Sequence, residues 1–569
     1  MERETIISFR NFGFQYTAQA EPTLYDIDLD IHRGETLLIA GPSGCGKSTI
    51  AHCINGLIPA SYPGKISGSL TVKGTIAVQL GLFGLSKVVG TVLQDSDSQF
   101  IGLTVAEDIA FALENDNVPR REMRKIVEQV ADLVDIRQVL THAPHEISGG
   151  QKQRVGLGGV MVNPVEVLLF DEPLANLDPA TGKQAIELIE DIQKRTGCAV
   201  IIIEHRLEDV LHRHVDRVVL MGQGRIVYDG SPEELLCGPL LQTGGIREPL
   251  YVTALKYAGI QPTPQMHPAS AQELTLSREQ CEQVRAWFRQ QPDAPPQEPG
   301  PVLLEAKDIH FTYPGGHYAL KGIDVTIRKG EMLSIVGTNG AGKSTFSKVI
   351  CGFETPQTGS LTLNGQNLLE LSIKERADRI GYVMQNPNQM ISKTMIFDEV
   401  ALGLRNRGVA EETIRERVEQ TLKICGLYPF RNWPVSALSY GQKKRVTIAS
   451  ILVLEPELLI LDEPTAGQDL RHYTEIMEFL RALNRKGVTI VLITHDMHLM
   501  LEYTPRAVVF HDGQVICDAT AAQVLNDPEV VAQAHLKETS LYHLALRCGL
   551  DDPEAFTRRF IACDQEVRQ

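Results

Sequence analysis

The sequence predicts an α/β protein that contains the same domain twice, each copy built on a mainly parallel sheet. Short apolar segments of strand length alternate with amphipathic segments of helix length, which is the pattern of parallel sheets covered by helices. A glycine-rich loop that ends in Gly-Lys-Ser-Thr occurs at residues 41–49 and again at residues 337–345. Three other short motifs recur in the same order, 290 or 291 residues after their first occurrence. This repeated order at an almost constant spacing indicates a duplicated domain.

The composition is that of a globular protein with an acidic surface. Hydrophobic residues make up 43% of the 569 residues and charged residues 22%, and the formal net charge is −16. The acidic excess argues against non-specific nucleic-acid binding, which depends on Lys and Arg at the phosphates. The chain shows neither the apolar segment of about 18–20 residues that spans a membrane nor a signal peptide. Its ten cysteines are scattered singly, which argues against disulfides or a zinc ribbon, so we expect a soluble protein of the cytosol.

Both glycine-rich loops lie between an apolar segment, 36–40 or 332–336, and the start of a predicted helix. This strand–loop–helix order is the context that a phosphate-binding loop requires. Glycines allow backbone conformations that point several N–H groups at phosphate oxygens. We expect Lys47 and Lys343 to reach the β- and γ-phosphates, and Ser48 and Ser344 to bind magnesium. The two nucleotide-binding loops consist of Gly41, Pro42, Ser43, Gly44, Cys45, Gly46, Lys47, Ser48 and Thr49, and of Gly337, Thr338, Asn339, Gly340, Ala341, Gly342, Lys343, Ser344 and Thr345.

An acidic pair follows a strongly apolar segment in each copy, Asp171-Glu172 in the first and Asp462-Glu463 in the second. The carboxyl ends of parallel strands are where open α/β folds bind their ligands. Hydrolysis of a nucleotide needs one carboxylate near the magnesium ion and another that orients or deprotonates water. We expect the aspartates to take the first role and the glutamates the second.

One histidine and one glutamine in each copy complete the predicted chemistry. His205 and His495 follow apolar segments, 34 and 33 residues after the aspartates, and this matched spacing indicates sensors of the γ-phosphate. Gln94 and Gln385 follow Val-Leu and Val-Met pairs at another predicted strand end. Because the carboxyl ends of neighbouring strands meet at one sheet edge, we expect both amides to lie near the magnesium ion.

Together these motifs resemble the ATP-binding-cassette family, whose signature motif looks like residues 148–151 and 439–442 of this chain. The resemblance implies two tandem ATPase domains, each with an antiparallel β subdomain and a helical subdomain beside the core sheet, and it implies ATP and Mg²⁺ as cofactors. In the family, two cassettes pair head to tail, and each signature closes over the ATP that the other cassette holds. The two halves would pair within this chain or with a second chain. The signature residues expected at the nucleotide are Ser148, Gly150, Gln151, Ser439, Gly441 and Gln442.

Tyr16 and Tyr313 lie 25 and 24 residues before their loops and look like the aromatic residues that stack on adenine in this family. An aromatic residue of a core strand is the other interpretation of these positions.

The motifs and the composition set the expected domain boundaries. The first ATPase domain covers residues 1–240 and the second residues 302–522. Residues 241–301 form a partly helical connector in which prolines crowd the end, as in extended linkers. Residues 523–569 form a mostly helical C-terminal extension.

Residues 438–446 and 385–389 look like the ATPases of energy-coupling-factor importers, which take up vitamins and metals such as cobalt. The resemblance implies a transmembrane coupling subunit and a separate substrate-binding membrane subunit as partners, and a peripheral location on the cytoplasmic face of the cell membrane. It leaves the transported substrate open.

Two alternatives remain at this stage. One is a soluble twin-cassette ATPase that acts on ribosomes or DNA, against which the net charge of −16 argues. The other is the ATPase of a different importer or of an exporter in the same family. We expect no nucleic-acid partner.

Overall fold

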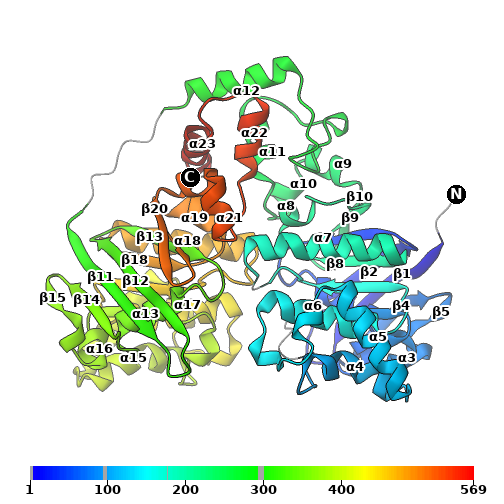
Figure 1. Cartoon of the computed structure of the whole chain (residues 1–569), viewed down its shortest axis with the longest axis horizontal. Helices are drawn as coiled ribbons and strands as arrows, with labels where there is room; N and C mark the ends of the chain where they lie inside the picture. Colours follow the sequence, from blue (N-terminus) through cyan, green and yellow to red (C-terminus); the bar gives the residue numbers. More distant parts are fainter. Residues whose placement is uncertain (1–3, 94–98, 176, 293–299, 569) are drawn as a thin grey trace. The chain divides into compact units, whose positions relative to one another are not determined.

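The computed structural model describes residues 4–93, 99–175, 177–292 and 300–568 (Figure 1). The chain divides into two compact units, Met1–Trp287 and Phe288–Gln569, and the boundary falls inside one helix. We describe each unit by itself.

The first unit is built around a six-stranded sheet with the order β10-β9-β3-β8-β7-β6. Five of these strands run parallel, and only the edge strand β10 pairs antiparallel with its neighbour. The parallel strands are rich in Val, Ile and Leu and almost fully buried, as expected for a sheet covered on both faces. The strands are β3 (Thr36–Ala40), β6 (Val89–Val92), β7 (Val167–Asp171), β8 (Ala199–Ile203), β9 (Arg217–Gly222) and β10 (Arg225–Gly230).

A second, antiparallel sheet of the first unit has the order β2-β1-β4-β5. Its strands are β1 (Thr5–Tyr16), β2 (Leu24–His32), β4 (Gly64–Val72) and β5 (Thr75–Ile76). Along β3, Leu37 and Ile39 join a cluster with this sheet, whereas Leu38 and Ala40 join a cluster on the opposite face. The alternation follows from the two-residue period of a strand.

The helices of the first unit cover both faces of the parallel sheet. Helix α1 packs in the cluster with the antiparallel sheet, whereas α4, α5 and α7 pack in the cluster on the other face. The helices are α1 (Lys47–Ile54), α2 (Leu57–Ala60), α3 (Ala77–Ser86), α4 (Val105–Asn115), α5 (Arg120–Leu133), α6 (Gly149–Met161), α7 (Pro179–Thr196), α8 (Leu207–Val210), α9 (Pro232–Cys237), α10 (Leu240–Thr243), α11 (Leu250–Tyr257) and α12 (Arg278–Gln290), the last of which contains the unit boundary.

The second unit repeats this topology. Its parallel sheet has the order β16-β17-β18-β13-β19-β20, again with an antiparallel edge strand, and its antiparallel sheet has the order β12-β11-β14-β15. The strands are β11 (Val302–Thr312), β12 (Tyr318–Arg328), β13 (Met332–Gly337), β14 (Thr358–Leu363), β15 (Gln366–Asn367), β16 (Ile380–Val383), β17 (Leu458–Asp462), β18 (Thr489–Ile493), β19 (Arg506–His511) and β20 (Gln514–Ala519).

The helices of the second unit follow the order of the first. In the described parts of the chain, four α-helices follow the last strand of each unit, α9–α12 after β10 and α20–α23 after β20. Helix α18 begins at an N-cap, Asp469, whose carboxylate accepts from the His472 N–H at 2.9 Å. The helices are α13 (Lys343–Cys351), α14 (Ile373–Ala377), α15 (Ile396–Asn406), α16 (Glu411–Ile424), α17 (Tyr440–Leu452), α18 (Leu470–Arg485), α19 (Met497–Tyr503), α20 (Ala521–Asn526), α21 (Pro528–Gln533), α22 (Ser540–Arg547) and α23 (Pro553–Val567).

The predicted fold class is confirmed: each unit combines a mainly parallel core sheet, a small antiparallel sheet and a set of helices. Within the described parts of the chain, no helix has the length and apolar character needed to cross a bilayer.

Candidate active site

Each glycine-rich loop connects the central strand of a parallel sheet to a buried helix. In the first unit the loop leads from β3 to α1, and Gly46 precedes the helix with a left-handed φ of 104°. Gly342 does the same before α13 with φ 98°. A side chain would be strained in this conformation, so glycine is required where the chain turns from loop into helix.

The lysines of both loops fold back onto their own loop. Lys47 Nζ donates to the carbonyls of Gly41 and Pro42 at 2.7 and 2.9 Å. Lys343 Nζ donates to Gly337 and Thr338, both at 2.8 Å. Both lysines are buried, so their charge is held at the centre of the loop, where a phosphate group would lie.

The acidic pairs lie at the carboxyl ends of the parallel strands β7 and β17, as predicted: Asp171 and Asp462 are the last residues of these strands, and the glutamates follow them. Glu172 and Glu463 have φ values of 49° and 44°, which non-glycine residues rarely adopt. Each is held there by its N–H, which donates at 2.9 Å to Ile203 O in the first unit and to Ile493 O in the second. Two equivalent glutamates in the same strained backbone conformation are typical of functional positions.

The groups predicted to hold magnesium fit that ion. In the second unit, Ser344 Oγ lies 3.3 Å from Asp462 Oδ2, so hydroxyl and carboxylate oxygens meet beside the loop. In the first unit, Asp171 Oδ1 is buried and has no hydrogen-bond partner among the described residues. Hard oxygen ligands of this kind are those that Mg²⁺ takes, usually together with phosphate oxygens and water.

Burial shifts the titration of these carboxylates. It raises the pKa of Asp171, an effect that Lys47 opposes and Glu204 strengthens. It also raises the pKa of Glu172, where His205 opposes the shift and Glu204 adds to it. The pKa of Asp462 is raised by burial and by Glu463. A carboxylate that holds a proton more strongly is a better general base.

The two histidines follow the strands β8 and β18 and lie beside carboxylates. His495 Nδ1 lies 2.7 Å from Glu463 Oε1, so the second unit brings these two predicted residues together. His205 Nδ1 lies 3.1 Å from Glu204 Oε1. Because β7 and β8 pair in parallel, as do β17 and β18, each histidine and its acidic pair share one sheet edge.

Gln385 comes two residues after β16, and the parallel partner of this strand, β17, ends in Asp462. Gln385 and Asp462 therefore lie at the same edge of the sheet, which agrees with the prediction that the amide is near the magnesium ion. Gln94 lies outside the described residues.

Tyr16 and Tyr313 are partly buried, and their hydroxyls lie 3.1 Å from Thr49 Oγ1 and 3.2 Å from Thr345 Oγ1. These contacts hold both aromatic rings next to the glycine-rich loops.

The signature segments form helix N-termini. Ser148 and Ser439 are the N-caps of α6 and α17, and each forms a capping box with the glutamine three residues later, Gln151 or Gln442. Such a terminus presents N–H groups and a positive dipole end, which favour an anion.

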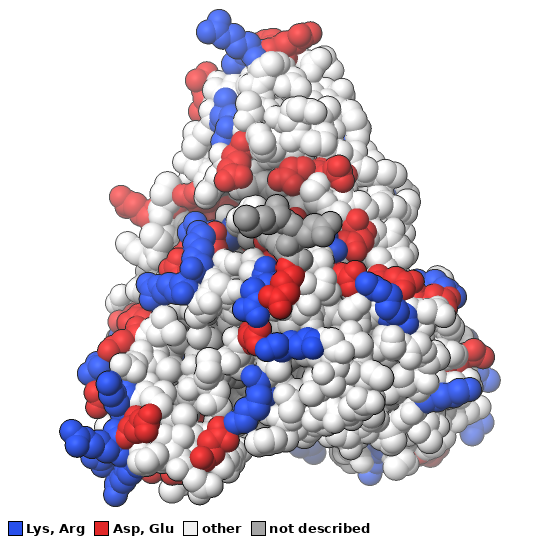
Figure 2. Space-filling model, turned by 90° about the vertical axis from the view of Figure 1, so that its right-hand side faces the viewer, with Lys and Arg blue, Asp and Glu red and all other residues white. Residues whose placement is uncertain are grey.

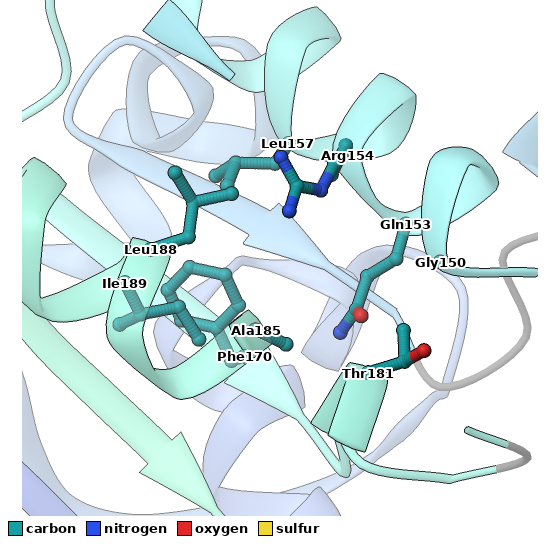
Figure 3. Close-up of a pocket in the computed structure, with 9 residues that line it drawn as sticks. All are labelled: Gly150, Gln153, Arg154, Leu157, Phe170, Thr181, Ala185, Leu188 and Ile189. Carbon is teal, nitrogen blue, oxygen red and sulfur yellow. The ribbon is translucent and has the colours of Figure 1, made fainter. Parts of the chain in front are cut away.

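A pocket lies between the signature helix α6, helix α7 and strand β7 of the first unit (Figure 3). A Cβ at Gly150 would lie 2.5 Å from Thr181 Cγ2, so a larger residue there would require the Thr181 side chain to move. Gln153 points across the pocket and donates to Pro173 O at 2.5 Å, which links the signature helix to the segment after Glu172. The pocket is lined by Gly150, Gln153, Arg154, Leu157, Phe170, Thr181, Ala185, Leu188 and Ile189.

Comparison with known proteins agrees with this geometry. The model of the ABC transporter family matches residues 24–175 and 320–466, so it finds one cassette in each half. An ABC transporter ATP-binding protein of Enterococcus faecalis is 58% identical over 567 residues and covers 100% of both chains. The chain belongs to the ABC transporter ATP-binding proteins. Members of this family are ATPases, and they bind ATP with Mg²⁺.

Other relatives cover the whole chain as well. An ABC transporter ATP-binding protein of Clostridium perfringens is 57% identical over 568 residues, with 100% of both chains covered. A second family model, described as an ATP-binding cassette cobalt transporter, matches residues 239–311. Among solved structures, cbiO1 of Clostridium perfringens, described as part of the ABC transporter complex cbiONQ, is 35% identical over 41% of this chain and 94% of its own, with a TM-score of 0.39.

Three residues of this ABC protein were not anticipated from its sequence. Lys444 of the signature helix is buried and donates to the carbonyls of Met384, Gln385 and Glu463 at 3.1, 2.5 and 3.4 Å. Tyr382 donates to Asp462 Oδ2 at 3.0 Å. Glu204 is the third, buried before His205. Each of the three differs from its equivalent in the other half, Gln153, Thr91 or Thr494, but many other positions differ as well, so the sequence alone does not single them out.

Proposed function

We propose that this chain hydrolyses ATP in both halves to energise an energy-coupling-factor importer of a vitamin or a metal ion such as cobalt. The observation that carries the proposal is the duplicated set of residues at the sheet edge: a loop lysine, a serine next to an aspartate, a strained glutamate and a histidine. Neither half lacks a member of this set.

In this proposal, Lys47 and Lys343 bind the phosphates, while Glu172 and Glu463 take the proton of the attacking water. His205 and His495 contact the γ-phosphate. Magnesium would be held by Ser48, Asp171 and Gln94 in the first half and by Ser344, Asp462 and Gln385 in the second. When bound, it would neutralise charge on the phosphate oxygens. The roles of the signature serines and glycines, and of Tyr16 and Tyr313 at adenine, remain predictions from the family resemblance.

The family description supports cobalt as a candidate cargo, because the model that matches residues 239–311 is described as a cobalt transporter. The proposed partners are a transmembrane coupling subunit and a separate substrate-binding membrane protein. This assignment puts the chain on the cytoplasmic face of the cell membrane, bound to those partners.

An ATPase that acts on ribosomes or DNA is less well supported. The net charge is −16, and on the face drawn in Figure 2 acidic and basic side chains lie side by side. Among the described residues of that face, Lys and Arg do not gather into the broad basic surface that binds phosphate backbones.

The test is to purify the tagged chain from detergent-solubilised membranes and to identify the proteins that accompany it. We expect two integral membrane proteins, and we expect proteoliposomes of the complex to accumulate Co²⁺ or a vitamin only when MgATP is on the chain's side. Recovery with ribosomes in place of membrane proteins would contradict the proposal. The chain with both Glu172→Gln and Glu463→Gln is the matched control, because it should assemble and yet transport nothing.

A further inference from the structure

The residue immediately before the histidine differs between the two halves. Glu204 follows β8 and Thr494 follows β18, at equivalent positions of equivalent strands. Both side chains are inaccessible, with exposed fractions of 1% and 0%. One half therefore buries a carboxylate where the other buries a hydroxyl.

In the second half, Thr494 supports the proposed base. Its Oγ1 donates to Glu463 Oε2 at 3.4 Å and accepts from the Asp496 N–H at 3.0 Å. His495 Nδ1 lies 2.7 Å from the other carboxylate oxygen of Glu463. Each oxygen of this carboxylate thus faces one polar partner, which fixes the orientation of the group.

In the first half, Glu204 replaces this support with an acceptor. Its Oε1 accepts from the N–H groups of His205 and Arg206 at 2.9 and 3.3 Å and lies 3.1 Å from His205 Nδ1. The Glu204 carboxylate accepts hydrogen bonds from its described partners. It therefore does not donate a hydrogen bond to Glu172 in the way that Thr494 donates one to Glu463. Its Oε2 is buried and has no hydrogen-bond partner among the residues that the structure describes.

A positive charge near Glu204 comes from Arg206, whose Nε lies 3.8 Å from Glu204 Oε1. This guanidinium is shared, because Nε also lies 3.9 Å from Asp209 and the side chain donates to Leu174 O. It is also one-third exposed, so solvent screens it more than it screens the buried carboxylate.

We propose that Glu204 is a positioning residue that slows hydrolysis in the first half, so that the two halves turn over ATP at unequal rates. Negative charge develops on the phosphoryl oxygens during hydrolysis, and a buried carboxylate close to His205 opposes it. Glu204 also competes with Glu172 for His205, whereas Thr494 leaves His495 to Glu463. The inference rests on the proposed roles of Glu172 and His205.

The experiment measures ATP hydrolysis by the purified full chain in two backgrounds. Glu463→Gln inactivates the second half, so the remaining ATP hydrolysis comes from the first half. Glu172→Gln inactivates the first half, so the remaining hydrolysis comes from the second. We expect kcat of the first half to be about tenfold lower than that of the second, the size of effect that one hydrogen bond to a charged group has. Glu204→Thr should raise kcat of the first half by about tenfold, while KM for ATP changes less than kcat.

Matched variants separate charge from shape. Glu204→Gln keeps the size and one acceptor oxygen but removes the charge. It should therefore raise kcat of the first half, but by less than Glu204→Thr does. Thr494→Glu should lower kcat of the second half. Because this site is fully buried, Thr494→Val serves as the variant that preserves the fold, and it should lower kcat by about tenfold through loss of the hydrogen bond to the charged Glu463.

Unchanged or lower turnover in Glu204→Thr, with the melting temperature retained, would overturn the inference. Failure of the proposed roles of Glu172 and Glu463 is distinguishable, because the chain with both Glu172→Gln and Glu463→Gln would then still hydrolyse ATP. If the two backgrounds hydrolyse ATP at equal rates and the double variant is inactive, the inference that the halves differ is rejected, whereas the proposed roles of Glu172 and Glu463 are retained.

Discussion

In the second half of the chain, the Nδ1 atom of His495 lies 2.7 Å from Oε1 of Glu463. This pair brings together a residue proposed to contact the γ-phosphate and a residue proposed to accept a proton from water. The proton acceptor and the phosphate contact therefore depend on one another.

The first prediction concerns the two glutamates. We expect the chain with both Glu172→Gln and Glu463→Gln to bind ATP but to hydrolyse it about 10²–10⁴ times more slowly, because an amide cannot accept the proton. Nucleotide binding is measured by fluorescence titration and turnover by phosphate release. Turnover at the wild-type rate would show that other groups act as the base.

The second prediction concerns Tyr16. If its ring stacks on adenine, Tyr16→Ala should weaken ATP binding by about tenfold, since stacking of a base on an aromatic ring is worth about 1–3 kcal/mol. Tyr16→Phe is the control, because it keeps the ring and loses only the contact with Thr49. A lower melting temperature in Tyr16→Ala without a change in affinity would assign the ring to the core instead.

The third prediction concerns Lys444 and pH. Burial lowers the pKa of Lys444 to about 8, an effect that Asp462 and Glu463 oppose. In the unfolded chain this lysine has its ordinary pKa near 10.4, so between these two values the unfolded state binds more protons. The free energy of unfolding should therefore rise with pH over this window, with a contribution of up to about 1.4 kcal/mol per pH unit from this residue.

Urea unfolding of the wild type and of Lys444→Gln at pH 7, 8, 9 and 10 checks this prediction. The variant carries the residue found at the equivalent position of the first half, Gln153, and it should lack this gain above pH 8. Lys443→Gln is the control, because it removes a lysine that is only partly buried. Parallel curves for the wild type and Lys444→Gln would contradict the expected titration.

The fourth prediction concerns Gly337 at the end of β13. A Cβ there would lie 1.9 Å from Phe510 O, and the residue has φ 136°. We expect Gly337→Ala to lower the free energy of unfolding by about 2 kcal/mol or more, because backbone must shift and the conformation is strained. Gly340→Ala is the comparison, since φ is 81° but no atom lies within 4 Å of its Cβ, so only a strain of about 1 kcal/mol remains. Equal melting temperatures for the two variants would contradict this reasoning.

The sequence predicted the parts of the fold and site that local patterns encode. The loops around Lys47 and Lys343 and the strand ends at Asp171 and Asp462 follow from short motifs with a direct physical meaning. The capping boxes at Ser148 and Ser439 are equally local, since each involves residues three apart.

Tertiary contacts could not be predicted in the same way. From the sequence, Lys444 looks like one of several basic residues on a solvent-exposed helix. The fold brings its Nζ to the carbonyls of Gln385 and Glu463. Glu204 reads as a polar residue after a strand, and its burial depends on which elements cover that strand end. Such residues gain their roles from partners far away along the chain, where periodicity and spacing carry no information.

The left-handed backbone at Glu172 and Glu463 has a consequence for how this protein has been shaped. Glycine would adopt the same φ without strain, so each glutamate is held in place at a conformational cost on the order of 1 kcal/mol. The rest of the fold supplies this free energy, and the protein gives up stability at the two positions where the proposed reaction needs a carboxylate.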